Sequence, residues 1–404
     1  MHSVREVNNE IVWVGCNDRR LARFENLFPI PRGVSYNSYL IKDEKVTLMD
    51  TVDAGASFQF LTNIDWTLSQ WGRGLDYLIV QHMEPDHGAN IEVLLKKFPE
   101  MKIVASAKAI AMMGQFFESD FSGRTIEVKE GDTLNIGKRT LQFITAPMVH
   151  WPEVIVTYDS YEKILFSADA FGVFGALNGH IFDDEIAFEK EWLNDARRYY
   201  ANIVGKFGNN VQALLKKLTP LDIAVICPLH GPIWRTDLSL FLDKYQKWST
   251  YEPEENAVVI IYGSIYGNTE QTANALAFRL ADAGVKKIAV HDVSSTHVSE
   301  LIGEIFRCSH LVIACSTYNG GVYPPMDNLL EDMKNLKVQN RTVAIIENGT
   351  WAPNSGKLII NKLLEMKDME IIEPVLTIKS TLKMARHDEL CSLAAKIADT
   401  VKQG

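Results

Sequence analysis

Residues 257–269 read AVVIIYGSIYGNT, an apolar run that ends in a turn of small and hydroxyl-bearing residues, and a helical pattern follows over 270–282. An unbroken apolar run is typical of a strand that is buried on both faces of a parallel sheet. Small residues at a strand-to-helix turn present backbone N–H groups and hydroxyls to a phosphate at the positive end of the helix. The turn therefore predicts a phosphate-binding loop.

This loop differs from two other nucleotide sites. It lacks the Gly-Lys-Ser/Thr ending of a P-loop and the G-x-G-x-x-G pattern of a dinucleotide site, so a mononucleotide is the expected ligand. The candidate binding residues are Ser264, Ile265, Tyr266, Gly267, Asn268 and Thr269.

The chain after residue 257 alternates between apolar strand patterns and helical patterns. This alternation predicts a doubly wound, five-stranded parallel sheet. In such sheets a ligand lies outside the carboxyl ends of the strands, so the loops after the third and fourth strands should complete the site. The candidate residues in these two loops are Ser316, Thr317, Tyr318, Asn319, Gly320, Gly321, Asn348, Gly349, Thr350 and Trp351.

A second candidate site follows the predicted strand at 77–80, where residues 81–88 read QHMEPDHG. His82, Glu84, Asp86 and His87 place four potential metal ligands within six residues. On a loop after a buried strand these charges would repel one another and the imidazoles would stay unpaired. A bound cation explains the cluster better than a solvated surface does.

Three later residues can complete the ligand set of this site. His150, Asp169 and His230 each come just after an apolar strand pattern, so they are expected at the same edge of the fold. Seven ligands exceed the four of a tetrahedral zinc site, and two metal ions are therefore predicted.

The chain has a predicted domain boundary near residue 252. Residues 251–256 read YEPEEN, a polar and acidic stretch marked by proline, just before the apolar strand quoted above. We expect one domain over 1–252, where short strands and helices indicate an α/β sandwich of layers, and a second over 253–404.

The composition of the chain argues against several classes of protein, among them nucleic-acid-binding, membrane-spanning and disulfide-rich proteins. Of the 404 residues 47% are hydrophobic and 23% charged, as in a folded globular protein, and the net charge of −10 disfavours nucleic acid or anionic lipid as a partner. No apolar run approaches the length of a membrane span and the N-terminus lacks a secretory pattern, so a cytoplasmic location is expected. The five cysteines are scattered, which predicts reduced thiols rather than a disulfide framework.

Both halves resemble known families. Residues 257–404 are similar to a flavodoxin domain with S-x-Y-G-N-T as its phosphate loop, which implies FMN with its phosphate on Ser264, Tyr266, Gly267, Asn268 and Thr269. The first half resembles the metallo-β-lactamase superfamily, an αββα sandwich whose hydrolases carry H-x-H-x-D-H. Here Glu84 replaces the second histidine. Bridging carboxylates and this harder donor set favour a non-haem di-iron centre over zinc.

The two halves together resemble the flavodiiron proteins. The resemblance implies that one iron is bound by His82, Glu84 and His150, the other by Asp86, His87 and His230, and that Asp169 bridges them. In some members the histidine that matches His87 turns away from the metal. The family reduces O2 to water or NO to N2O with electrons that pass through FMN from rubredoxin or from reduced coenzyme F420. Tyr199, Tyr200 and His180 are candidates for hydrogen-bond donors around the site.

The resemblance also implies an assembly. Domains of about 150 and 250 residues have radii of gyration of about 15 and 18 Å, so two sites in one chain can lie too far apart for fast electron transfer. A head-to-tail homodimer, or a dimer of dimers, would set the flavin of one subunit against the metals of the other. In the family an aromatic residue that matches Trp351 lies between the two cofactors.

Two other interpretations stay open at this point. A binuclear zinc hydrolase with an accessory flavodoxin domain would use the same fold, although Glu84, Asp169 and the flavin loops weigh against it. An electron-transfer protein with a vestigial metal site is the other, and the complete set of seven ligands weakens it.

Overall fold

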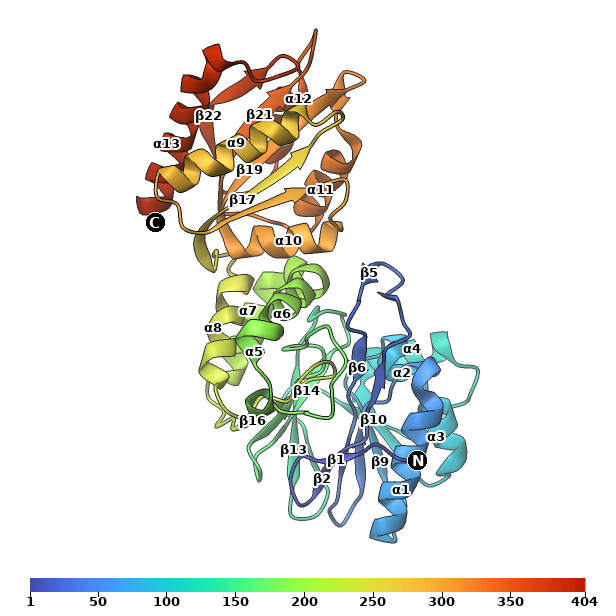
Figure 1. Cartoon of the computed structure of the whole chain (residues 1–404). Helices are drawn as coiled ribbons and strands as arrows, with labels where there is room; N and C mark the ends of the chain where they lie inside the picture. The colour runs from blue at the N-terminus through green and yellow to red at the C-terminus, as the bar shows by residue number, and fades with distance from the viewer. Residues whose placement is uncertain (404) are drawn as a thin grey trace. The chain divides into compact units, whose positions relative to one another are not determined.

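The computed structural model describes residues 1–403, and the chain divides into two compact units. The first unit comprises Met1–Tyr200 and Asn209–Tyr245. The second comprises Ala201–Gly208 and the chain from Gln246 onward. Figure 1 shows the first unit in blue to green and most of the second in yellow to red.

The first unit contains two stacked sheets. The seven-stranded sheet has the order β1 (Arg5–Glu6), β2 (Ile11–Trp13), β7 (Tyr39–Ile41), β8 (Thr47–Met49), β9 (Tyr77–Val80), β10 (Lys102–Ser106) and β11 (Thr125–Val128). Its strands from β8 to β11 are parallel. The five-stranded sheet has the order β12 (Thr133–Asn135), β13 (Thr140–Thr145), β14 (Ile155–Asp159), β15 (Ile164–Phe166) and β16 (Val225–Cys227).

Helices cover the outer faces of both sheets, as Figure 1 shows. The helices beside the larger sheet are α1 (Ser57–Trp71), α3 (Ile91–Lys97) and α4 (Ala107–Phe116). Those beside the smaller sheet are α5 (Phe188–Glu191), α6 (Leu193–Tyr199), α7 (Gly208–Leu218) and α8 (Leu238–Ser249). Two small antiparallel sheets of two strands each complete the unit, β3 (Cys16–Asp18) with β6 (Val34–Tyr36) and β4 (Arg23–Phe24) with β5 (Phe28–Pro29). The predicted αββα sandwich is confirmed.

The second unit is a doubly wound sheet. Its parallel strands have the order β18 (Ile288–Asp292), β17 (Glu255–Gly263), β19 (Cys308–Tyr318), β21 (Arg341–Asn348) and β22 (Met369–Ile378). The flanking helices are α9 (Asn268–Asp282), α10 (Val298–Arg307), α11 (Pro324–Asn335), α12 (Ser355–Leu363) and α13 (His387–Gln403). The short β20 (Gly321–Val322) pairs with the end of β19. The five-stranded prediction is confirmed, and the strand order reverses between β17 and β19, where a ligand is expected.

Arg341, at the start of β21, is a buried cation that ties several segments of the second unit together. Its guanidinium donates hydrogen bonds to the carbonyls of Tyr251 (2.8 Å), Ile305 (2.7 Å) and Phe306 (3.1 Å). The last two belong to the final turn of α10, where carbonyls have no partner within the helix. Two further acceptors are the carbonyls of Gln339 and Asn340. The Tyr251 hydroxyl in turn donates to the carbonyl of Gly205 at 2.8 Å.

A buried histidine makes the stability of the second unit depend on pH. His310 on β19 is 6% exposed, its two ring nitrogens face the hydroxyls of Ser309 and Thr400, and burial lowers its pKa to about 4. The folded state therefore binds fewer protons than the unfolded state, in which the pKa is about 6.5. Stability is complete above pH 6.5 and falls as the pH drops toward 4, by roughly 2 kcal/mol after allowance for partial solvent screening.

The measurement is chemical denaturation at pH 4.5 and pH 7.5, followed by circular dichroism, on the parent chain and on His310→Gln. The parent should lose about 2 kcal/mol more than the variant between the two pH values. Equal losses would show that another group carries the dependence.

Candidate functional site

The structure brings the seven predicted metal ligands together where the two sheets of the first unit meet. The loop after β9 and the short α2 (Pro85–Gly88) supply the first four ligands. The other three follow β13, β15 and β16 of the smaller sheet. Each side chain is buried, and the full set is His82, Glu84, Asp86, His87, His150, Asp169 and His230.

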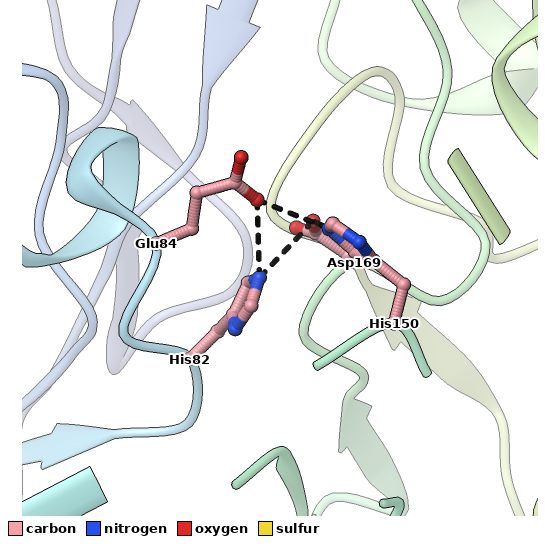
Figure 2. Close-up of side chains that lie close together, drawn as sticks. All are labelled: His82, Glu84, His150 and Asp169. Carbon is pink, nitrogen blue, oxygen red and sulfur yellow. Dashed lines mark hydrogen bonds and ion pairs between the residues drawn. The ribbon is translucent and has the colours of Figure 1, made fainter. Parts of the chain in front are cut away.

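Four of these side chains form a first group, drawn in Figure 2. Glu84 Oε2 lies 3.2 Å from His82 Nε2 and 3.0 Å from His150 Nε2. Asp169 Oδ2 faces the same two imidazoles, at 3.6 Å from His82 and 3.3 Å from His150. Two nitrogens and two oxygens thus converge on one point.

Asp86, His87 and His230 form a second group next to the first. His87 Nε2 lies 3.4 Å from Asp86 Oδ1 and 3.1 Å from His230 Nε2. Asp169 takes part here through its other oxygen, because Oδ1 lies 3.2 Å from His87 Nε2 and 3.7 Å from His230 Nε2. Asp169 therefore presents one carboxylate oxygen to each group.

The donor chemistry of the site fits two bound cations. Both carboxylate oxygens of Asp86 and of Asp169 are buried and have no hydrogen-bond partner in the part of the chain that the structure describes. Buried anions without partners are costly unless a cation compensates them. Carboxylate and imidazole ligands, with one carboxylate shared between two groups, suit a pair of redox-active or Lewis-acidic metals.

The side chains at the site also shift one another's pKa values. Burial alone would lower the pKa of His150, yet the nearby carboxylates of Asp169 and Glu84 raise that pKa to about 9. Burial alone would raise the pKa of Glu84, but hydrogen bonds to His150 and His82 lower it instead. Glu84 is therefore ionised at neutral pH, as a metal ligand must be.

Of the three candidate donors around the site, Tyr199 lies beside the metal-binding groups. Its ring centroid is 5.7 Å from that of His230, and its buried hydroxyl has no hydrogen-bond partner within residues 1–403. The ring of Tyr200 packs against Tyr245 with centroids 5.0 Å apart. The His180 side chain is 59% exposed and lies 3.7 Å from Glu185, which is not one of the seven candidate ligands.

Sequence reasoning missed three acidic residues at the site. Asp50 accepts hydrogen bonds from the backbone N–H groups of Gln81 (2.7 Å) and His82 (3.2 Å). Glu153 accepts from His82 Nδ1 at 2.7 Å. Glu25, at the tip of the β4–β5 hairpin, is exposed on its outer side, but the protein atoms that surround its carboxyl and the charge of Glu84 raise its pKa to about 7. Of these three, only Asp50 carried a signal in the sequence, because it directly follows an apolar strand as the candidate ligands do.

The second unit holds a cavity of about 520 Å³ at the carboxyl ends of its strands. All the predicted loop residues except Gly267 and Gly321 line it, and so do Ala352 and Ser380, which the sequence did not reveal. Gly267 caps α9 with a φ of 89°, a conformation that favours glycine, and its N–H donates to Ser264 Oγ. Gly321 pairs with Tyr318 in the β19–β20 hairpin.

Hydrogen bonds tie the loops of this cavity together. Thr269 Oγ1 lies 2.9 Å from Ser316 Oγ, and Asn348 Nδ2 donates to Thr269 Oγ1 at 3.2 Å. Asn348 also pairs with both backbone groups of Ser380. At the mouth Tyr266 is 92% and Trp351 90% exposed. The cavity thus joins a helix N-terminus to aromatic rings, which suits a phosphate-bearing, flat-ringed ligand.

Within residues 1–403, none of the helices combines the length and the apolar character that a bilayer crossing demands. All five cysteines are free thiols, and Cys391 is the one that is partly exposed.

Comparisons with known proteins agree with this architecture. The ODP family beta lactamase model matches residues 34–231, and the flavodoxin model matches residues 260–391. The anaerobic nitric oxide reductase flavorubredoxin of Vibrio vulnificus is 31% identical over 85% of this chain and 70% of its own length.

Two solved structures are similar over almost their whole length. The rubredoxin oxygen:oxidoreductase of Desulfovibrio gigas gives a TM-score of 0.91 at 29% identity and covers 99% of both chains. A variant of the flavo di-iron protein of Thermotoga maritima gives 0.86 at 25% identity, over 97% of this chain and 98% of that one. Family models match both halves of the chain, the beta lactamase model first and the flavodoxin model second, and the relatives match across both halves. The chain therefore belongs to the flavodiiron family of oxidoreductases.

Proposed function

We propose that this protein reduces O2 to water, NO to N2O, or both, at a non-haem di-iron centre in its first unit. The observation that carries the proposal is the placement of Asp169, whose two oxygens face two separate groups of buried ligands. Electrons would reach the metals through FMN from an external donor, either rubredoxin or reduced F420.

The ligand assignment follows the two groups of side chains. His82, Glu84 and His150 would hold one iron, Asp86, His87 and His230 would hold the other, and Asp169 would be shared. When bound, the ferrous pair supplies two electrons and reduced FMN two more, which together satisfy the four-electron reduction of O2 and exceed the two that coupling of two NO molecules requires.

The protein's own residues shape the site around the metals. The seven ligands are buried, which keeps bulk water away from the reacting gas. The Tyr199 hydroxyl is buried beside His230 without a protein partner among the described residues, so it can donate a hydrogen bond into the site. The names of the relatives support both gases, since one is a nitric oxide reductase and another an oxygen oxidoreductase.

The flavin belongs to the second unit, because a flavodoxin domain implies FMN. We propose that its phosphate binds at Ser264, Tyr266, Gly267, Asn268 and Thr269, and that the loops after β19 and β21 hold the ring. In this assignment residues 1–252 serve the metals and residues 253–404 serve the flavin. We also propose a cytoplasmic, head-to-tail homodimer or dimer of dimers, in which the exposed Trp351 lies between flavin and metals.

The test is the cofactor content and turnover of protein purified without added metal. About two irons and one FMN per chain, with O2 or NO consumption driven by rubredoxin or reduced F420, are the expected result. Two zinc ions with hydrolysis of a thioester or a lactam would replace the proposal by a binuclear hydrolase. Full iron and FMN without turnover of either gas would refute it.

Asn348 offers a separate prediction about the flavin. Asn348→Leu removes the hydrogen bonds that tie Thr269 and the Ser380 loop to β21, so the loops lose their preformed arrangement. Each lost bond is worth about 1 kcal/mol, and we expect the Kd for FMN to rise by at least about tenfold. Fluorescence titration of the apoprotein with FMN measures this. Asn361→Leu, at an exposed position on α12, is the control and should bind FMN as the parent does.

A further inference from the structure

The imidazoles of the metal centre have different partners behind them. His82 Nδ1 lies 2.7 Å from Oε1 of Glu153, and His230 Nδ1 lies 2.7 Å from the backbone carbonyl of Ser35. His87 Nδ1 is buried and has no hydrogen-bond partner within the described residues. Among the described residues, the far nitrogen of His82 thus meets a carboxylate, that of His230 a neutral carbonyl, and that of His87 no hydrogen-bond partner.

Glu153 is held firmly in its position behind His82. The residue is 2% exposed, and its Oε1 accepts a second hydrogen bond from the backbone N–H of Met83 at 2.9 Å. Its own carbonyl accepts from the hydroxyl of Ser106 at 2.8 Å. The carboxylate therefore fixes both the ring and the backbone of the loop that carries the first ligands.

Such partners change how well an imidazole binds a metal. A carboxylate on the far nitrogen fixes the tautomer and the orientation of the ring and raises its basicity, and its removal typically weakens metal binding by about 10- to 100-fold. A carbonyl fixes the tautomer without adding charge. A ring whose far nitrogen has no hydrogen-bond partner, as in His87, has neither its tautomer fixed nor its basicity raised in this way.

The number of ligands does not separate the two groups. Each has three side chains of its own, and both share Asp169, which turns Oδ2 toward the first group and Oδ1 toward the second. The difference lies in the atoms behind the imidazoles, and the carboxylate of Glu153 behind His82 favours the first group as the tighter site.

We infer that the two metal positions differ in affinity, that the His82 group fills first, and that Glu153 is the positioning residue that makes it the tighter one. The inference rests on the proposed metal centre and on no step of the proposed reaction. It also assigns the weaker position to the Asp86, His87 and His230 group.

The experiment is an anaerobic titration of the metal-free protein with Co²⁺, followed by calorimetry and by the visible spectrum of the bound ion. The parent should bind two equivalents in two phases whose Kd values differ by at least about tenfold. Glu153→Gln keeps the oxygen acceptor but loses its charge and should weaken the first phase by about 10-fold. Glu153→Ala loses both and should weaken it by about 100-fold.

His87→Ala identifies which phase belongs to which group. It should remove the weak phase and leave the tight one in place, and this holds even if the Glu153 variants do not fold. Glu347→Gln is the matched control, because Glu347 is a half-buried carboxylate of the second unit that also accepts two hydrogen bonds, from Gly356 N–H and the Thr377 hydroxyl. It should leave both phases unchanged.

Several results would overturn the inference. These are two equal phases in the parent, an unchanged first phase in Glu153→Gln that folds as the parent does, or loss of the tight phase in His87→Ala. The titration uses neither gas nor electron donor. A chain that binds Co²⁺ with two different affinities but turns over neither O2 nor NO would refute the proposed reaction and leave this inference standing. An active enzyme that binds both Co²⁺ ions with equal affinity would refute this inference and leave the proposed reaction standing.

Discussion

Replacing Asp169 by asparagine is expected to lower O2 and NO turnover by at least about 100-fold and to reduce the metal content of the purified chain. Asp169 is fully buried and offers Oδ2 to the first ligand group and Oδ1 to the second. The amide introduced by Asp169→Asn would be neutral and would present an N–H₂ donor to one group, where a metal needs a lone pair. Because loss of a mere outer partner already weakens metal sites by about 10- to 100-fold, loss of the shared ligand should cost more.

The measurement is iron per chain by mass spectrometry together with steady-state gas consumption. Asp222→Asn is the control, since the Asp222 side chain is 74% exposed and its one recorded ion pair is with Lys163, which is not a candidate ligand. It should keep both the metals and the activity. Full iron and parental turnover in Asp169→Asn would show that the carboxylate is not shared between two metals.

Replacing Arg341 by methionine is expected to destabilise the second unit by about 3–5 kcal/mol. Methionine fills a similar volume but leaves the carbonyls of Tyr251, Ile305 and Phe306 buried without their donor. Each unsatisfied polar group costs about 1–3 kcal/mol, and part of this is offset because the buried cation was itself expensive. Burial is the reason that the pKa of Arg341 is lowered to about 10.

Urea denaturation, followed by circular dichroism and by release of FMN, measures this effect. Arg279→Met serves as the control on α9, because Arg279 is 40% exposed at its side chain and makes a surface ion pair with Asp282. Its stability should stay within about 0.5 kcal/mol of the parent. If Arg341→Met unfolds at the parental urea concentration, the carbonyls find other donors and the argument from burial is wrong.

The grouping of the seven candidate ligands was predictable because the relevant signal is local. Each ligand loop directly follows an apolar strand, and strands of a layered fold deliver their ends to a common edge. His150, Asp169 and His230 could therefore be grouped with His82 without any knowledge of their distances. The loops after β17, β19 and β21 were predictable for the same reason.

The residues that were missed depend on contacts between distant segments. Glu153 lies in the middle of a loop and reaches a ring 71 residues earlier in the chain, which no local pattern encodes. Ser380 lines the cavity of the second unit because Asn348 binds its backbone across 32 residues. Side-chain length and loop conformation decide such contacts, and sequence periodicity carries no information on either.

The segment from residue 185 to 204 shows how packing divides a helical pattern. Its sequence has the periodicity of a single helix, but the structure divides it into α5, α6 and a π-helical turn at Tyr200–Val204. Trp192 leaves the helical region with a φ of −124° and buries its indole against Gly175. Tertiary packing of one large ring thus outweighs the helical propensity of its neighbours.

The hydrogen bonds of Arg341 and Tyr251 bear on how pieces of this protein could be exchanged with those of other proteins. Arg341 holds the carbonyl of Tyr251, and the hydroxyl of Tyr251 holds Gly205. A flavin-binding fragment that starts at residue 253 would lack both partners. A fragment that starts at Gln246 would keep the hydrogen bond between Arg341 and Tyr251. The hydrogen bond between Tyr251 and Gly205 would be kept only in a protein that also contains the segment around Gly205. The two units are thus distinct in their folds but not separable at a single cut.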